Sequence, residues 1–421
     1  MPVVEISYSR LQKLVGKASK KQISESLPFL GLDIESDDKD LVRVEYSPNR
    51  PDYSTDFGIS LGLQGILGIK TGSIKLKIKK SKTYAINVKP NVSKIRPFVT
   101  GIVAKNGKID DKIIKQLMAM QEDLHFGIGR KRKKSSIGIH DLDKICFPLT
   151  YTTTDRNYKF IPLNSKVEQK ISEILQNTEV GQDYGYVLGN SPQVPIIVDS
   201  NDDTVSFPPI VNADKTTVTT KTNNLFVEVT GINKNDAEDM LSVVATILQA
   251  AGFSLESVNI KGAKNNTPRL NHRKISISPS LVNDSLGLSL SHQVIVSSLK
   301  KSRLDASVIG KKITCQIPPY RFVIFGPMDL VEEVALGYGI EKLTPKLSSS
   351  ETLGMIHPIS SKLKSLSLTM VGLGYLEALN SSLTSKRILF DMTNRMPQNS
   401  ISVLDSKSQE HTILRDSILP G

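Results

Sequence analysis

The chain has 421 residues, 39% of them hydrophobic, and a formal net charge of +12. This length predicts more than one domain, and the excess of Lys and Arg favours a polyanionic partner such as nucleic acid. No segment has the roughly 18 consecutive apolar residues of a membrane-spanning helix, and the N-terminus lacks a signal-peptide pattern, so we expect no membrane association. The two cysteines, Cys146 and Cys315, are too few for a disulfide framework or a zinc site, which favours a cytoplasmic location.

Residues 1–72 are predicted to form an N-terminal α/β domain. Ser9 is a candidate cap for a helix over residues 10–15. Residues 41–46 alternate apolar and charged side chains, which is typical of a strand. Residues 73–82 alternate Ile and Leu with Lys, which predicts a strand with a cationic face or a lysine-protected edge strand.

Residues 84–262 are predicted to form a second domain. Its predicted elements are a strand over 96–105, a helix over 112–124, strands over 137–140, 206–212 and 225–230, and a helix over 235–251. The threonine-rich stretch between the last two strands suits a hairpin. The last helix carries a clear apolar stripe on one side.

Two further units follow, over residues 268–346 and 359–421. The predicted elements are a helix over 291–299, a strand over 312–317, a helix over 328–338, a helix starting at 359 and a strand over 376–383. The chain ends in an apolar strand and turn that lack a pairing partner in this pattern. We therefore expect a partner chain or further sequence to complete the last domain.

Four segments together resemble one protein family. They are SPNRPDYSTDFGISLGLQGILG, RKRKKSSIGIHDLD, SFPPIVNAD with FVEVTG, and IPPYRFVIFGPMDLVEEVALGYG. Their order and spacing resemble the phenylalanine–tRNA ligase beta subunits of the archaeal and eukaryotic type, with the C-terminal domain incomplete.

The resemblance implies an α+β multidomain fold. It comprises a mixed-sheet editing domain over 84–262, a small winged-helix-like domain over 268–346, and the start of a catalytically silent class II synthetase-like domain over 359–421. It also implies an assembly of two alpha and two beta chains in which the alpha chain binds ATP and attaches phenylalanine to its tRNA. The beta chain would hold tRNA and hydrolyse mischarged tyrosyl-tRNA. The chain has no GxxxxGK[ST] motif, which agrees with ATP binding on the partner.

Polar side chains on the strands of the second domain are the candidate editing residues. Glu228 and Thr230 are alternate residues of one strand and share a face. An apolar pocket rejects an added hydroxyl only about a hundredfold, so a polar pocket that binds the phenol is needed to remove tyrosine. The resemblance implies that Asn212, Glu228 and Thr230 line this pocket, with Glu228 or Asn212 reading the hydroxyl. Weaker candidates are Ser206 and His140.

The chemistry of these residues has alternatives. Asn212 and Thr230 can also be turn and strand-end residues without a chemical role. His140-Asp141 can be a catalytic dyad or a structural hydrogen bond. Because no serine or cysteine with a base partner is recognisable, we expect a positioned water to cleave the ester, aided by a hydroxyl of the tRNA.

An acidic group on the predicted helix over 328–338 is a candidate metal site. Asp329 and Glu332 share a helix face and can bind a hard cation, or they can simply be acids favoured at a helix N-terminus. The resemblance implies that Asp329, Glu332 and Glu333 are Mg²⁺ ligands. The family has a further aspartate where this chain has Val323, so one ligand is missing.

A basic run precedes the strand over 137–140. It comprises Arg130, Lys131, Arg132 and Lys133, and it is a candidate tRNA phosphate contact or a solvated charged turn. Two other functions stay open: a non-enzymatic RNA-binding or assembly protein, and a free-standing editing hydrolase of the same fold.

Overall fold

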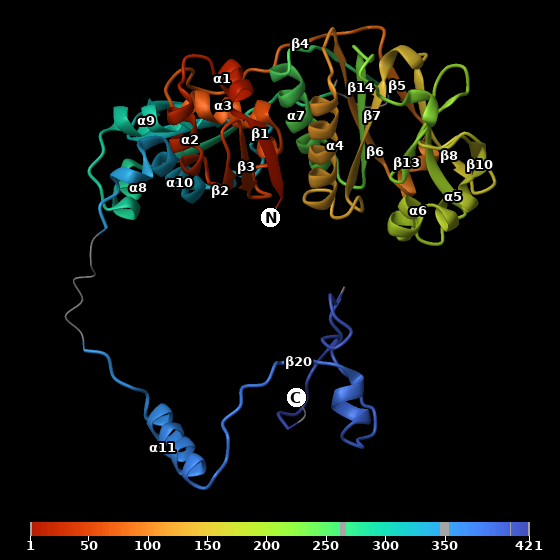
Figure 1. Cartoon of the computed structure of the whole chain (residues 1–421). Helices are drawn as coiled ribbons and strands as arrows, with labels where there is room; N and C mark the ends of the chain where they lie inside the picture. Colours follow the sequence, from red (N-terminus) through yellow and green to blue (C-terminus); the bar gives the residue numbers. More distant parts are fainter. Residues whose placement is uncertain (1, 262–266, 346–352, 405, 420–421) are drawn as a thin grey trace. The chain divides into compact units, whose positions relative to one another are not determined.

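The computed structural model describes residues 2–261, 267–345, 353–404 and 406–419, and it divides into two compact units, Met1–Thr344 and Pro345–Gly421 (Figure 1). The described part of the first unit has an α+β architecture with four sheets of three or more strands and one two-stranded ladder. The predicted domain ends at Gly262, Lys346 and Gly421 lie outside the described residues.

The N-terminal part of unit 1 is a three-stranded antiparallel sheet with helices on it. The strands, in spatial order, are β1 (Val3–Ser7), β3 (Leu41–Tyr46) and β2 (Leu32–Asp37). The helices are α1 (Tyr8–Val15), α2 (Lys20–Ser26) and α3 (Asp56–Ile66). Their apolar faces form one buried cluster that includes Ile6, Leu11, Val42 and Leu63. The predicted strand over 41–46 is confirmed, whereas α1 begins before Ser9 and has Ser7 at its N-cap.

Two mixed sheets form the middle of unit 1. The five-stranded sheet has the order β4 (Ile78–Lys79), β15 (Ser254–Ser257), β6 (Phe98–Lys105), β14 (Leu225–Gly231) and β7 (Ser135–Asp141). The six-stranded sheet has the order β13 (Val211–Asn212), β12 (Thr204–Phe207), β11 (Gln193–Val198), β8 (Leu149–Asp155), β5 (Ala85–Val88) and β16 (Asn259–Lys261). Val103 and Phe226 of the first sheet share a buried cluster with Tyr151 and Ile197 of the second. The two sheets therefore pack face to face.

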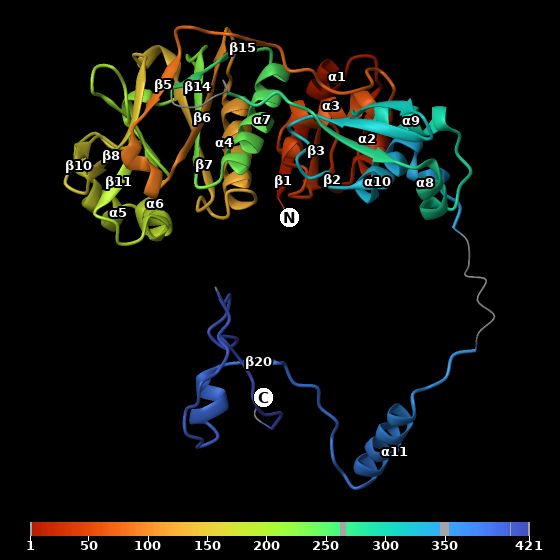
Figure 2. The same ribbon diagram turned by 180° about the vertical axis from the view of Figure 1, so that it is seen from behind.

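Two long helices, α4 (Asp111–Phe126) and α7 (Lys234–Ala250), cover the other face of the five-stranded sheet (Figure 2). The Asp110 side chain caps α4 by accepting a hydrogen bond from the backbone N–H of Ile113, and Asn233 caps α7 in the same way. Both helices bury residues at helical spacing in one cluster with β6, β14 and β7. The far end of the six-stranded sheet carries the short elements β9 (Lys159–Phe160), β10 (Gln169–Lys170), α5 (Ile171–Asn177) and α6 (Glu179–Tyr184).

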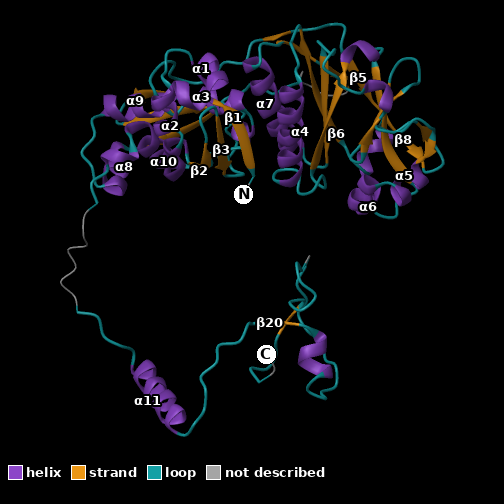
Figure 3. Ribbon diagram, viewed as in Figure 1, coloured by secondary structure: helices purple, strands orange, loops and turns teal. Residues whose placement is uncertain are grey.

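The last part of unit 1 is a three-stranded antiparallel sheet with three helices (Figure 3). The elements are β17 (Arg273–Ile277), β19 (Lys312–Ile317), β18 (Asp305–Ile309), α8 (Pro279–Leu286), α9 (His292–Lys301) and α10 (Pro327–Tyr338). It contacts the segment after the N-terminal helices: Ser73 Oγ donates to Asp305 Oδ2 at 2.7 Å, and Arg303 donates to the Lys70 carbonyl at 2.6 Å.

Two strand predictions in unit 1 are corrected. Only Ile78–Lys79 of the predicted strand over 73–82 pairs with another strand, because the side chain of Gln249 on α7 takes the Lys77 N–H and the Lys75 carbonyl. The predicted strand over 206–212 is interrupted at Pro208-Pro209 and becomes β12 and β13. These two strands pair with each other, and β14 belongs to the other sheet, so the predicted hairpin with β14 does not form.

Unit 2 contains the helix α11 (Pro358–Gly372), the π-helical turn Arg387–Asp391 and a small ladder of β20 (Leu383–Thr384) with β21 (Ile413–Leu414). The predicted strand over 376–383 is wrong, because only its last residue belongs to a strand. The apolar C-terminal segment was expected to lack a partner, but Ile413–Leu414 pairs with β20 within the chain. Across the described residues, no helix is long and apolar enough to cross a membrane.

Candidate active site

A cavity of about 440 Å³ lies in the middle of unit 1. Its walls come from α4, β7, β14, the Phe207–Asn212 turn and residues after β13. Polar side chains on these walls are Gln121, Glu122, Arg132, Ser136, Asn164, Asn212, Thr216, Thr217 and Glu228. The remaining lining is mostly apolar. A largely apolar cavity with a few fixed polar groups is typical of a small-molecule site.

Glu228 is the buried acid of this cavity. It lies on β14, opposite Gly138 of β7 and Gly101 of β6, and is only 3% exposed. Ser206 Oγ donates a 3.0 Å hydrogen bond to its Oε1, whereas Oε2 has no hydrogen-bond partner among the residues that the structure describes. A buried carboxylate oxygen without a donor is costly, so Glu228 is suited to accept a hydrogen bond from a ligand.

His140 lies beside this carboxylate. Its Nδ1 is 2.9 Å from Thr216 Oγ1, and its Nε2 is 4.0 Å from Glu228 Oε1. Because the Thr216 hydroxyl donates to the Ala213 carbonyl, it accepts from His140 Nδ1–H, which leaves Nε2 as an acceptor in the neutral ring. Asp141 instead accepts a hydrogen bond from Thr222, so the two residues do not form a dyad.

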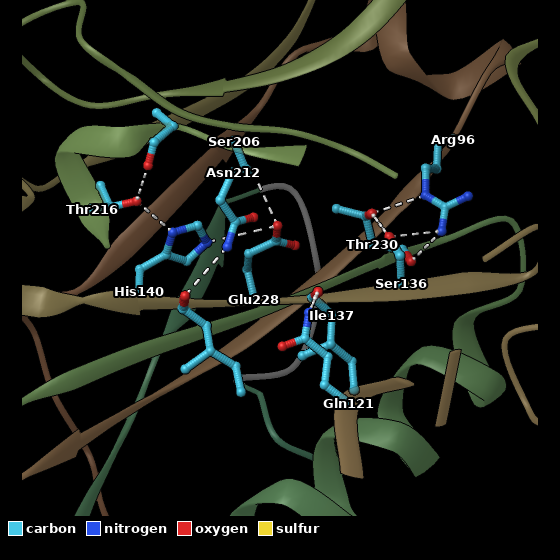
Figure 4. Close-up of polar contacts among 12 residues, drawn as sticks. Arg96, Gln121, Ser136, Ile137, His140, Ser206, Asn212, Thr216, Glu228 and Thr230 are labelled. Atoms are coloured by element: carbon cyan, nitrogen blue, oxygen red, sulfur yellow. Dashed lines mark hydrogen bonds and ion pairs between the residues drawn. The ribbon is translucent and has the colours of Figure 1, made fainter. Parts of the chain in front are cut away.

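Asn212 reaches the same place from the other sheet. Its amide nitrogen donates to the Ile139 carbonyl of β7 at 3.3 Å. Figure 4 shows the Glu228, His140 and Asn212 side chains directed toward one another. The two sequence candidates Asn212 and Glu228 therefore do meet in the cavity, although they come from different sheets.

Gly138 was not among the predicted site residues, yet its lack of a side chain lets Glu228, His140 and Asn212 approach the backbone of β7. An added Cβ would lie 2.6 Å from Glu228 Oε1, 2.6 Å from His140 Nε2 and 3.1 Å from Asn212 Oδ1. No side chain fits there without displacing these groups. An isolated glycine inside the apolar strand SSIGIH is the sequence signal that could have identified it.

Thr230 lies outside the cavity. It is 0% exposed, and Arg96 Nε donates to its Oγ1 at 2.8 Å, with Ser136 Oγ 3.2 Å away (Figure 4). It shares a strand face with Glu228 as predicted, but two residues along β14 amount to more than 6 Å. The structure therefore separates Thr230 from the two other candidates.

The four basic residues that precede β7 differ in orientation. Arg130, Lys131 and Lys133 are exposed, but the side chain of Arg132 is 11% exposed and lines the cavity. Its guanidinium donates to the Ile210 carbonyl at 2.9 Å and to Glu122 at 2.8 Å. The basic run thus has three exposed side chains and one, Arg132, on the cavity wall.

His125 connects α4 to the cavity strand. The backbone N–H of Ile137 donates to its Nε2 at 2.8 Å, and its Nδ1 lies 3.2 Å from Glu122 Oε1. Burial lowers the pKa of His125 from its usual 6.5, and Arg132 lowers it further, against the opposing effect of Glu122.

This lowered pKa predicts a pH-dependent stability. In the unfolded chain His125 binds a proton near pH 6.5, whereas in the folded chain it binds one only at lower pH. The contribution of His125 to the free energy of unfolding is therefore fully present above pH 6.5 and is lost as the pH falls toward the lowered folded pKa. Urea unfolding between pH 7.5 and 5 should show this decline. In His125→Gln, whose amide oxygen can accept from Ile137, the slope should be smaller. An unchanged slope would contradict the assignment.

The three acids predicted to bind Mg²⁺ do not converge. Asp329 accepts hydrogen bonds from the backbone N–H groups of Phe325 and Gly326 and so caps α10, Glu332 is exposed, and buried Glu333 forms an ion pair with Arg321. Among the described residues, no group of three His, Cys, Asp or Glu side chains is arranged to hold a metal. These side chains, as arranged here, therefore do not fit a Mg²⁺ site formed by this chain alone.

The ion pair predicts a contrast between neighbouring acids. Glu333→Gln leaves the buried Arg321 charge without its partner and should lower the free energy of unfolding by about 3–5 kcal/mol. Glu332→Gln, at an exposed position, should change it by less than about 0.5 kcal/mol. Thermal unfolding of the full chain with and without EDTA checks both. Equal, EDTA-sensitive effects would instead indicate a shared metal.

Comparisons with known proteins identify three domains in the chain. Residues 80–241 match the B3/4 domain model, 275–340 the tRNA synthetase B5 domain, and 340–421 the phenylalanyl tRNA synthetase beta chain CLM domain. The chain is 39% identical to the phenylalanine–tRNA ligase beta subunit of Archaeoglobus fulgidus and 36% to that of Methanosarcina barkeri. These matches cover all of the chain and 77% and 78% of the relatives.

A solved structure is also similar. It is an N-terminal fragment of the phenylalanyl-tRNA synthetase beta subunit from Pyrococcus horikoshii, with a TM-score of 0.75 and 28% identity, and the match covers 80% of this chain and 99% of the fragment.

The fold, the cavity and the matched domains together define a subunit of an aminoacyl-tRNA synthetase that carries an editing domain. The similarity to the archaeal proteins, which extends over the whole of this chain, is more specific. The chain belongs to the phenylalanine–tRNA ligase beta subunit family.

Proposed function

We propose that the cavity lined by α4, β7, β14 and the Phe207–Asn212 turn hydrolyses tyrosyl-tRNA in which tyrosine has been attached by mistake to a phenylalanine tRNA. The observation that carries this proposal is the unpaired Oε2 of Glu228, an acceptor that a phenol hydroxyl can reach and that phenylalanine leaves unsatisfied. Ser206 holds the other carboxylate oxygen in place. The apolar lining accommodates the ring of either amino acid.

Selection in this cavity rests on the cost of an unpaired buried group. A hydrogen bond to a charged acceptor contributes about 1.5–3 kcal/mol, which corresponds to roughly ten- to hundredfold preference for tyrosine. Because Gly138 has no side chain, the Glu228, His140 and Asn212 side chains can approach one another next to it, and we place the hydroxyl beside this group, at Glu228 Oε2. This selection is the reverse of that in a phenylalanine-attaching site, because here the added hydroxyl of tyrosine strengthens binding.

The hydrolytic step itself needs a water and a proton acceptor. Water adds to the ester carbonyl, the bond to the ribose oxygen breaks, and that oxygen takes up a proton, which releases tyrosine and the uncharged tRNA. The cavity supplies no Ser or Cys nucleophile paired with a base among its described lining residues. We therefore assign this chain the roles of binding and orientation, and a tRNA hydroxyl the role of assisting the water.

The other modules fit a supporting role. We infer that the sheet and helices over 268–346 form a winged-helix-like domain, that 84–262 is the editing domain beside an N-terminal domain over 1–72, and that 359–421 starts a catalytically silent class II-like domain. An alpha chain would provide ATP binding and phenylalanine attachment, in an assembly of two alpha and two beta chains. Members of this family generally use Mg²⁺; we place no step of editing on it. A cytoplasmic location stays a prediction.

The test compares two substrates. The full chain, alone and with its alpha chain, is incubated with tyrosyl-tRNA and with phenylalanyl-tRNA, both made on the same phenylalanine tRNA. We expect hydrolysis of the tyrosyl ester to be about ten- to a hundredfold faster. Equal rates, or no hydrolysis by either preparation, would refute the proposal. The full-length similarity to ligase beta subunits does not favour the two non-ligase alternatives.

A further inference from the structure

The loop between α4 and β7, residues Arg130–Lys134, has an unusual backbone. Arg130, Lys131 and Arg132 have φ of 50°, 53° and 64°, so three consecutive residues with side chains adopt the left-handed conformation. This conformation is unfavourable for all residues except glycine, and successive instances are rare. Such strain persists only where the surroundings impose it.

Arg96 provides part of these surroundings, together with backbone bonds from the Arg132 N–H to the His125 carbonyl and from the Lys134 N–H to the Gly129 carbonyl. It is 2% exposed, and its guanidinium donates to the carbonyls of Arg132 and Lys133 at 3.2 and 3.3 Å. It also donates to Thr230 Oγ1 and to the Thr230 carbonyl, both at 2.8 Å. A single buried side chain therefore fixes the loop to the end of β14, the strand that carries Glu228.

The left-handed loop turns Arg132 back into the protein. Besides its bond to Glu122, its guanidinium donates to the Ile210 carbonyl and stacks on the Tyr184 ring with 4.1 Å to the centroid. These contacts join three elements: α4, the turn after β12 and α6. The turn is the cavity wall that leads directly to Asn212.

The neighbouring cations stay on the outside. Arg130 and Lys133 are exposed on the same loop, only one or two residues from Arg132. An exposed cation can neutralise a phosphate, whereas a guanidinium held by a carboxylate and two carbonyls has little capacity left for one. The loop thus has an outer face for a polyanion and an inner face that holds the cavity wall.

We propose that Arg96 and Arg132 are positioning residues of the editing site. Arg96 holds the basic loop in its left-handed form, and Arg132 in turn holds the Phe207–Asn212 turn in place. Arg130 and Lys133 bind the phosphates of the tRNA end. This inference rests on the proposed function for its substrate. The residues of the basic run thus have two different roles, which the sequence pattern alone does not distinguish.

The experiment uses charge-conserving variants of the full chain with tyrosyl-tRNA as the probe. Arg132→Lys keeps the charge but cannot bridge Glu122 and the wall, and Arg96→Lys cannot bridge Thr230 and the loop carbonyls. Both should lower kcat for deacylation by about ten- to a hundredfold, since small misplacements cost that much, with KM within about twofold of the wild type. Arg130→Gln and Lys133→Gln should instead raise KM and weaken its salt dependence, with kcat unchanged.

Hydrogen–deuterium exchange separates this inference from the proposed function, because it needs no turnover. Exchange at residues 207–212 should be faster in Arg132→Lys and Arg96→Lys than in the wild type, and unchanged in the matched Lys133→Gln. A wild-type kcat together with wild-type exchange in Arg132→Lys would overturn the clamp. Should Arg96→Lys not fold, Thr230→Val, which removes one Arg96 contact at 2.8 Å and lies outside the cavity, should give a smaller change in the same direction, and no change would overturn the role of Arg96.

Discussion

Replacing Glu228 by Ala should reduce deacylation of tyrosyl-tRNA by about a hundredfold and leave the attachment of phenylalanine unchanged. Among the described residues that line the cavity, Glu228 is the buried carboxylate, and its Oε2 has no donor. Glu228→Gln keeps the shape and one neutral acceptor, so its loss should be smaller, about tenfold. The measurement is the rate of tyrosine release from tyrosyl-tRNA under single-turnover conditions.

A control and a stability measurement make this prediction specific. Glu256→Ala removes an acid from the same sheet, on β15. Glu256 forms an ion pair with Lys105 at 3.1 Å and is outside the cavity lining, so this variant should retain full deacylation. Because an unpaired buried carboxylate oxygen disfavours the folded state, Glu228→Gln should be no less stable than the wild type. Full editing by Glu228→Ala, or a loss of editing that parallels a loss of folded protein, would contradict the assignment.

Gly138→Ala should be the second severe change. The new Cβ would lie 2.6 Å from both Glu228 Oε1 and His140 Nε2, so these groups must shift from the positions in which we propose they meet the phenol hydroxyl. We expect deacylation of tyrosyl-tRNA to fall at least about tenfold, because a misplaced hydroxyl loses its acceptor. Overpacking should also lower the free energy of unfolding by about 1–3 kcal/mol.

Gly185→Ala is the matched control for this variant. Gly185 also lies within residues 80–241, the span matched by the B3/4 domain. Its added Cβ would meet only the end of the Leu175 side chain, at 3.3 Å. It should therefore deacylate tyrosyl-tRNA like the wild type. If Gly138→Ala does the same, the space next to Glu228 is not where the hydroxyl binds.

Local sequence patterns predicted many of the elements. The alternation over 41–46 and the apolar stripe of α7 each appear at the expected residues within one or two positions, because periodicity shows which face of an element is buried. The same period placed Glu228 and Thr230 on one face of β14. Patterns failed where a side chain replaced a strand partner, as Gln249 does next to Lys75 and Lys77.

Only the tertiary structure decided which of these residues share a site. Asn212 and Glu228 meet because two sheets pack together, although no pattern along the chain encodes that distance. Thr230 lies farther along β14 and is bonded to buried Arg96, and Arg132 points inward from a loop in which it and the two preceding residues are left-handed. The physical reason is that periodicity records burial, which is a property of single residues, whereas a site depends on which distant segments the packed core brings face to face.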